Sequence, residues 1–91
     1  KKESINEEKN IKILGITIIN NKNGVKVTSI ENKESNLEIG DIILEVNREL
    51  VNDIDTFYNI TTNIEKTGRS SLLLKILRNE EQLWVTIKFN N

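Results

Sequence analysis

The residues best suited to acid–base or metal chemistry lie in LEIGDIILEVN, residues 37–47, where Asp41 follows a glycine and Glu45 interrupts an apolar run. A catalytic or metal-binding carboxylate needs a second carboxylate or a histidine nearby, and this stretch has none at ligand spacing. Gly40 followed by Asp41 is typical of a tight turn, in which glycine takes positive φ and aspartate accepts hydrogen bonds from nearby amides. We therefore predict that Asp41 shapes the fold and that Glu45 points to solvent.

The chain also has no residues for a Ser–His or Cys–His nucleophile, because it contains no histidine and no cysteine. Ser29, Ser70 and Ser71 consequently have no base to activate them. The same composition excludes a Cys/His zinc site and a disulfide framework within these residues. We predict a domain with no catalytic residues, no metal and no cofactor.

One glycine needs a different explanation. Ile13-Leu14-Gly15-Ile16 places Gly15 inside an apolar run at the head of an expected strand, where glycine costs backbone entropy and contributes no packing. One interpretation is a loop whose backbone amides turn towards an anionic group. The other is a β-bulge or a close approach of two backbones. The residues alone leave both interpretations open.

Apolar periodicity predicts five strands, over residues 14–19, 25–30, 41–46, 71–77 and 83–89. Alternation places Ile42, Leu44 and Val46 on the core face of the third strand. The last two strands are joined by residues 78–81, a link short enough for a hairpin in which Asn79 takes a left-handed conformation.

A helix is predicted between the third and fourth strands. Asn52 or Asp53 can cap its start, apolar residues recur at helical spacing up to Ile64, and Gly68 stands where a C-terminal cap is expected. A second, fainter helical turn is possible over residues 33–37. These elements predict an α+β domain.

Composition limits the possible partners. Thirteen basic and fourteen acidic residues leave a net charge of -1, which gives no electrostatic reason to expect nucleic acid or an anionic membrane. The longest apolar runs are three residues, so no segment is expected to span a bilayer. We expect residues 1–10 to be a linker or disordered flank and residues 11–91 to form a single domain. Because Lys1 is not an initiator methionine, we expect a piece of a longer protein.

Three stretches resemble PDZ domains. LEIGDIILEVNRELV is similar to the L-x-x-G-D-x-I-x-x-x-N-G-x-x-V stretch of that family, and ILGI resembles its carboxylate-binding loop. LLKILRNEEQLWVTIKF resembles the close of PDZ domains in HtrA/Deg-type (DegP-like) bacterial envelope serine proteases. The resemblance covers residues 11–89. The order of the elements is similar to that of permuted bacterial PDZ domains. The resemblance also implies that this domain is the second, C-terminal PDZ domain of its parent. It implies a PDZ-like sheet of five to six mostly antiparallel strands, partly closed, capped by one main and one short helix.

The sequence departs from the family pattern in three places. Arg48 stands where a glycine usually follows Asn47, so the turn is wider or Asn47 carries the positive φ. Glu34 and Ser35 replace the small residues usual in the short helix, and a glycine or proline expected near Lys33 is missing. These last two departures put the short helix in question.

The resemblance implies that the domain binds peptides by β-augmentation. An extended peptide would pair with the exposed edge of residues 16–19, opposite the helix, and its terminal carboxylate would meet the loop amides. The implied carboxylate-binding loop is Ile13, Leu14, Gly15 and Ile16, with charge assistance from Lys12. The implied groove contains Ile18, Phe57, Thr61 and Ile64, with Ile16 at its loop end. Each groove side chain is equally compatible with core packing.

The expected function is a regulatory module of an HtrA-like periplasmic serine protease that binds C-terminal or extended apolar segments of unfolded substrates. The expected partners are such peptides, the protease domain and other subunits of the parent, located in the periplasm or cell envelope. One alternative is an assembly module that contacts other subunits while its groove stays idle. Another is a PDZ domain of a different envelope protease.

Overall fold

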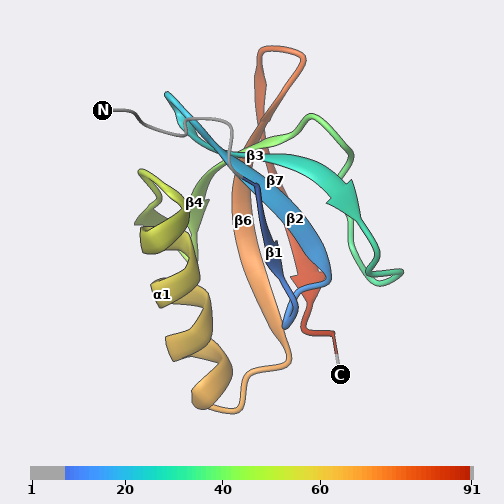
Figure 1. Ribbon diagram of the computed structural model, residues 1–91, viewed down its shortest axis with the longest axis vertical. Coiled ribbons are helices and arrows are strands. Elements are labelled where there is room, and N and C mark those ends of the chain that lie inside the picture. The colour runs from blue at the N-terminus through green and yellow to red at the C-terminus, as the bar shows by residue number, and fades with distance from the viewer. Residues whose placement is uncertain (1–7, 91) are drawn as a thin grey trace.

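The computed structural model describes residues 8–90, which form a curved antiparallel sheet with one helix against its side (Figure 1). The elements in chain order are β1 (Glu8–Ile11), β2 (Ile16–Asn21), β3 (Gly24–Ile30), β4 (Ile42–Val46), β5 (Glu49–Leu50), α1 (Ile54–Lys66), β6 (Ser71–Arg78) and β7 (Glu81–Lys88). No helix within residues 8–90 is long and apolar enough to cross a membrane.

The strands form one sheet in the order β1-β2-β3-β4-β6-β7, and β5 pairs with β4. Every pairing is antiparallel. The predicted α+β, PDZ-like fold is confirmed. The described residues contain seven strands where five to six were expected, because β1 and the two-residue β5 join the sheet.

The core is one cluster of buried apolar side chains from the sheet, α1 and the segments that join them. Leu72, Leu74 and Ile76 of β6 are buried on one face, as the alternation predicts. In β4 the predicted face is wrong for Ile42 and Leu44, which are only half-buried while Ile43 is buried. It is right for Val46, which is buried. The cause of this difference is a register shift between Ile43 and Glu45 in the β4–β6 ladder, since a bulge reverses the alternation that follows it.

The helix α1 begins and ends close to where its cap residues predict. Asp53 is the N-cap, and its carboxylate accepts a hydrogen bond from the Thr56 amide at 2.9 Å. That bond lowers the pKa of Asp53 below its ordinary value. Beyond the C-cap Thr67, Gly68 takes φ +89 and donates to the Glu65 carbonyl at 3.1 Å. The helix buries Ile54, Phe57 and Thr61 against the sheet.

The short helix expected over residues 33–37 is absent from this part of the structure. Ser35 instead bridges Ile87 of β7, and the Asn36 amide and side chain both donate to the Thr86 carbonyl. Side chains that bond to nearby backbone compete with helix formation, and Ser35 does so by accepting from the Leu37 amide at 3.0 Å. The segment therefore lies along the edge of β7.

Two tight turns use positive φ at residues other than glycine. Asn47 (φ 48) and Arg48 (φ 72) connect β4 to β5, and Asn79 (φ 53) with Glu80 (φ 68) connects β6 to β7. Positive φ at both central residues is the type I′ pattern, which matches the twist of an antiparallel pair. The prediction of a left-handed Asn79 is confirmed, and Arg48 takes the place of the family's glycine without widening the turn.

The first strand lies where a linker was expected. Residues 1–7 of the expected flank lie outside the described residues, but Glu8, Lys9 and Asn10 pair with β2. These three side chains are exposed, and only Ile11 is buried. A strand with one apolar residue shows no alternation, so its pairing depends on backbone hydrogen bonding along the edge of β2.

Candidate functional site

Asp41, the first residue considered for chemistry, has a structural role. Its carboxylate is 2% exposed and accepts hydrogen bonds from Arg78 Nε at 2.9 Å, Arg78 Nη2 at 2.7 Å and the Glu38 amide at 2.7 Å. Gly40 takes φ +100, as the turn interpretation predicts. The hydrogen bonds to Asp41 raise the pKa of Arg78. A carboxylate that accepts two hydrogen bonds from one arginine fixes the 38–41 turn to β6. Glu45, expected in solvent, is half-buried with Lys75 Nζ at 3.8 Å.

The ILGI segment forms the turn between β1 and β2. The amides of Leu14 and Gly15 both point at one acceptor, the Ile11 carbonyl oxygen, at 3.0 and 2.8 Å. Gly15 has φ +66, and a Cβ there would lie 3.0 Å from Asn32 Cβ. The close-approach interpretation is confirmed, because Asn32 lies against Gly15. The Leu14 and Gly15 amides bond to a carbonyl oxygen of their own turn, so the anion-binding interpretation stays a prediction. Ile13 is half-buried, and Lys12 is exposed in the turn.

A buried asparagine that the sequence did not single out holds this turn in place. Asn32 Nδ2 donates to the Leu14 carbonyl at 2.9 Å and to the Lys88 carbonyl at 2.7 Å. The Gly15 carbonyl accepts from the Asn32 amide at 3.1 Å, and the Ile13 carbonyl accepts from the Asn90 amide at 2.6 Å. Asn32 lies in the polar run ENKESN, where nothing in the pattern distinguishes it from its neighbours.

The predicted groove residues come together between β2 and α1. Ile16 and Ile18 of β2, and Phe57 and Thr61 of α1, are completely buried, whereas Ile64 is half-buried. The Thr61 hydroxyl donates to the Tyr58 carbonyl at 3.1 Å. The Ile54 amide donates to Asn20 Oδ1 at 2.8 Å, which ties the end of β2 to the start of the helix.

The edge of β2, expected to be free, is paired with β1 along residues 16–19. The partners are Ile11↔Ile16, Asn10↔Thr17, Lys9↔Ile18 and Glu8↔Ile19. In Figure 1, β1 lies on the helix side of β2. The chain itself therefore supplies an antiparallel strand at the edge where a peptide was expected.

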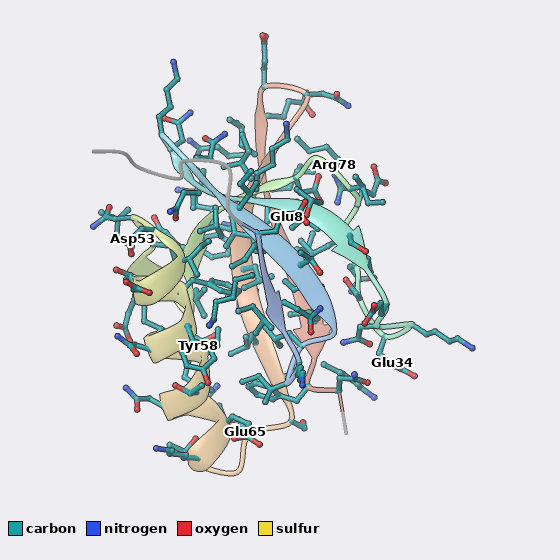
Figure 2. All side chains as sticks on the ribbon, in the orientation of Figure 1. Glu8, Glu34, Asp53, Tyr58, Glu65 and Arg78 are labelled. Carbon is teal, nitrogen blue, oxygen red and sulfur yellow. The ribbon has the colours of Figure 1, made fainter. Side chains whose placement is uncertain are left out.

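The open end of the groove is polar. A cavity of about 390 Å³ is lined by Glu8, Lys9, Asn20, Asp53, Ile54 and Asp55. Lys9 Nζ lies 5.0 Å from the centre of the Tyr58 ring, a cation–π contact between β1 and α1. Asp53 and Tyr58 are labelled on α1 in Figure 2, at the start and in the middle of the helix. Three carboxylates and one ammonium give this end of the groove a negative balance.

The sheet with one helix, the amide-bearing turn and the groove beside it define a class of domain. A model of the PDZ domain family matches residues 13–89, and the chain belongs to that family. Over 72 residues it is 31% identical to a probable periplasmic serine endoprotease, DegP-like, from Rickettsia conorii. That alignment covers 79% of this chain and 14% of the relative, so the chain spans a small part of the relative's length. The resemblance to PDZ domains of HtrA/Deg type is confirmed.

Proposed function

We propose that this chain is a peptide-binding regulatory module of an HtrA/DegP-type serine protease located in the periplasm. It binds extended or C-terminal apolar segments of unfolded proteins by adding them as a strand to β2. Family membership and the description of the Rickettsia relative support this proposal. The observation that carries it is the strand β1, which already lies in the groove with an isoleucine buried at the loop end.

The proposed peptide runs antiparallel to β2 and ends at the loop. Its terminal side chain takes the place of Ile11, next to Ile16. Its carboxylate accepts hydrogen bonds from the Leu14 and Gly15 amides, which now donate to the Ile11 carbonyl. Lys12, exposed in the same turn, adds positive charge.

The module takes no part in bond cleavage itself, because it has neither histidine nor cysteine to pair with a nucleophile. In this proposal the chemistry belongs to a protease domain of the parent, and the module contributes substrate tethering or relays substrate binding to that domain.

A second candidate function is an assembly module with an idle groove. The observation that favours it is also β1, because a paired edge offers no free backbone groups to a peptide. In this alternative the surfaces away from the groove contact other subunits of the parent.

The two candidate functions predict different results when one labelled peptide is titrated with the chain. The peptide has an apolar last residue and is prepared both as the free acid and as the C-terminal amide. For the peptide-binding module we expect the acid to bind with a dissociation constant on the order of micromolar or weaker, and the amide to bind less tightly. Lys12→Gln should weaken binding of the acid alone, whereas Lys22→Gln, in an exposed turn, should change neither. Failure of a broad peptide panel to bind would favour the assembly module.

A further inference from the structure

The strand β1 has the direction and position of a peptide added to β2. It runs antiparallel to β2, and its last residue, Ile11, pairs with Ile16 at the start of β2, beside the turn. A peptide whose C-terminus lies at the turn must run the same way. The four residues Glu8–Ile11 therefore represent the last four residues of a bound peptide.

Ile11 fulfils both requirements of a C-terminal residue in this groove. Its side chain is completely buried, within the same core cluster as Ile16, Ile18 and Phe57. Its carbonyl oxygen accepts from the Leu14 and Gly15 amides at 3.0 and 2.8 Å. One oxygen with two backbone donors is half of the arrangement that a carboxylate would adopt there. An apolar residue thus anchors the strand.

Two residues before Ile11, Lys9 faces the helix. Its Nζ lies 5.0 Å from the Tyr58 ring centre, and it lines the same cavity as Asp53 and Asp55. Both the ring and the carboxylates favour a cation at this position. Asn10 faces the other side of the hairpin, where its Nδ2 donates to Thr17 Oγ1 at 3.0 Å.

A ligand that is part of the chain competes strongly with one that is not. Only residues 12–15 separate Ile11 from Ile16, and a segment tethered this closely has an effective concentration on the order of millimolar or more. A peptide binding to the fraction of molecules with β1 undocked loses apparent affinity in proportion to that fraction. The family match covers residues 13–89 and does not extend over β1.

We propose that β1 is an internal ligand of the groove, and that peptides bind in trans by displacing it when they carry its pattern, a basic residue two positions before an apolar C-terminal residue. This inference rests on the proposed peptide-binding function. It adds a regulatory state, in which the groove is closed by the chain, and a ligand class, read from the side chains that β1 presents to the groove.

The first test compares the full chain with a chain that begins at Lys12. The probe is a labelled peptide that ends in Glu-Lys-Asn-Ile with a free carboxylate. We expect the shortened chain to bind this peptide at least tenfold more tightly than the full chain does. If the shortened chain is unfolded alone, we expect the peptide to restore its β-sheet circular dichroism, because the peptide supplies the missing strand and the isoleucine of the core.

The second test keeps β1 in the chain and fixes it there. Asn10 and Thr17 are directly opposite on β1 and β2, and the chain contains no cysteine, so Asn10→Cys with Thr17→Cys creates one cross-strand disulfide. The oxidised protein should not bind the probe at any concentration at which the reduced protein does. Because both states have the same sequence, the comparison is independent of the deletion.

The third test concerns the basic position. A peptide ending in Glu-Glu-Asn-Ile should bind the shortened chain at least threefold less tightly than one ending in Glu-Lys-Asn-Ile. Tyr58→Ala should reduce this difference, whereas Tyr58→Phe should retain it, because phenylalanine keeps the ring and loses only the hydroxyl. Equal binding of the two peptides to the unsubstituted groove would overturn the proposed ligand pattern.

The outcomes separate the inference from the function on which it rests. Binding of the probe to the oxidised protein, or equal affinity for the full and shortened chains, would overturn β1 as an internal ligand and leave peptide binding intact. A folded shortened chain that binds no peptide would overturn the proposed function and the inference together. A shortened chain that is unfolded and stays so with the peptide present would overturn the inference, and the titration of the full chain would still decide the function.

Discussion

The side chain of Asn32 donates to carbonyl oxygens of Leu14 and Lys88 and accepts from the Glu34 amide at 2.7 Å, while remaining 6% exposed. Removing it takes this donor away from the buried Leu14 carbonyl and the partly buried Lys88 carbonyl. We expect Asn32→Ala to lower the free energy of unfolding by about 2–4 kcal/mol, since each unsatisfied buried group costs about 1–3 kcal/mol. Urea unfolding followed by circular dichroism measures the difference.

The matched control is Asn36→Ala. Asn36 also donates to a backbone carbonyl, that of Thr86 at 3.0 Å, but it is exposed, so water can replace its side chain. Its loss should cost under about 1 kcal/mol. A cost for Asn32→Ala no greater than that of the control would contradict the role of Asn32 in holding the turn.

Gly24 begins β3 where the chain passes very close to β4. Its φ is +154, and a Cβ there would lie 2.1 Å from the Ile43 carbonyl oxygen. Gly68 also has positive φ, +89, but a Cβ there would meet nothing within 4 Å. Both alanine variants have unfavourable φ, which costs about 1 kcal/mol, and only Gly24→Ala also has the clash. Thermal unfolding should therefore show a much larger loss for Gly24→Ala, and equal losses would refute the close approach.

At the scale of elements, the bulge in β4 decides which side chain the core contains. Ile43 is completely buried and Leu44 is half-buried. We expect Ile43→Ala to cost about 2–5 kcal/mol and Leu44→Ala less than half as much, because the second change leaves a smaller cavity. Denaturant unfolding of both variants measures the ratio. A larger loss for Leu44→Ala would contradict the bulge and indicate that Leu44 is the core residue, as uninterrupted alternation predicts.

The N-cap of α1 predicts a small dependence of stability on pH. The hydrogen bond from the Thr56 amide lowers the folded-state pKa of Asp53. The ionised carboxylate therefore contributes fully to the free energy of unfolding above the unfolded-state pKa. That contribution is lost as pH falls through the lower folded-state pKa. Because Asp53 is exposed to solvent, the effect is smaller than for a buried carboxylate.

The corresponding variants are Asp53→Ala and Asp53→Asn. Asp53→Ala should lower the free energy of unfolding by about 1 kcal/mol at neutral pH, and the difference from the unsubstituted chain should shrink in acid. Asp53→Asn keeps a capping oxygen without a titrating group, so the cap that it forms should be independent of pH. Thermal melts between neutral and acidic pH decide this, and a loss for Asp53→Ala that stays constant down to acidic pH would count against it.

The elements that could be predicted are those whose sequence signals lie within the element itself. The helix has a cap residue at each end, and β6 alternates without interruption from Leu72 to Ile76, so pattern and structure agree. Ile42 and Leu44 were assigned to the wrong face of β4 because a bulge depends on the partner strand. The helical turn over 33–37 was not found because that segment bonds to Thr86, 50 residues away in sequence. The loop and groove residues followed from the PDZ resemblance, but β1 has too few apolar side chains to be recognised.

At the scale of the whole molecule, the chain contains no histidine or cysteine that could serve in a nucleophile–base pair. We expect the purified chain to leave unfolded casein intact, as measured by release of labelled fragments. The appropriate control is a mock purification from cells without the chain. Cleavage that copurifies with the chain and is absent from the mock preparation would contradict this.

The hairpin of β1 and β2 also determines how the domain responds to tension. Glu8 pairs with Ile19 at the end of the hairpin farthest from the turn, and Ile11 pairs with Ile16 beside it. A force on Glu8 directed across the strands, away from β2, therefore breaks these pairs one after another, starting from Glu8 and ending at the turn. The buried Ile11 is the last to yield. A modest mechanical force, applied through the polypeptide alone, would uncover the edge of β2 before it disturbed the pairing of β6 with β7.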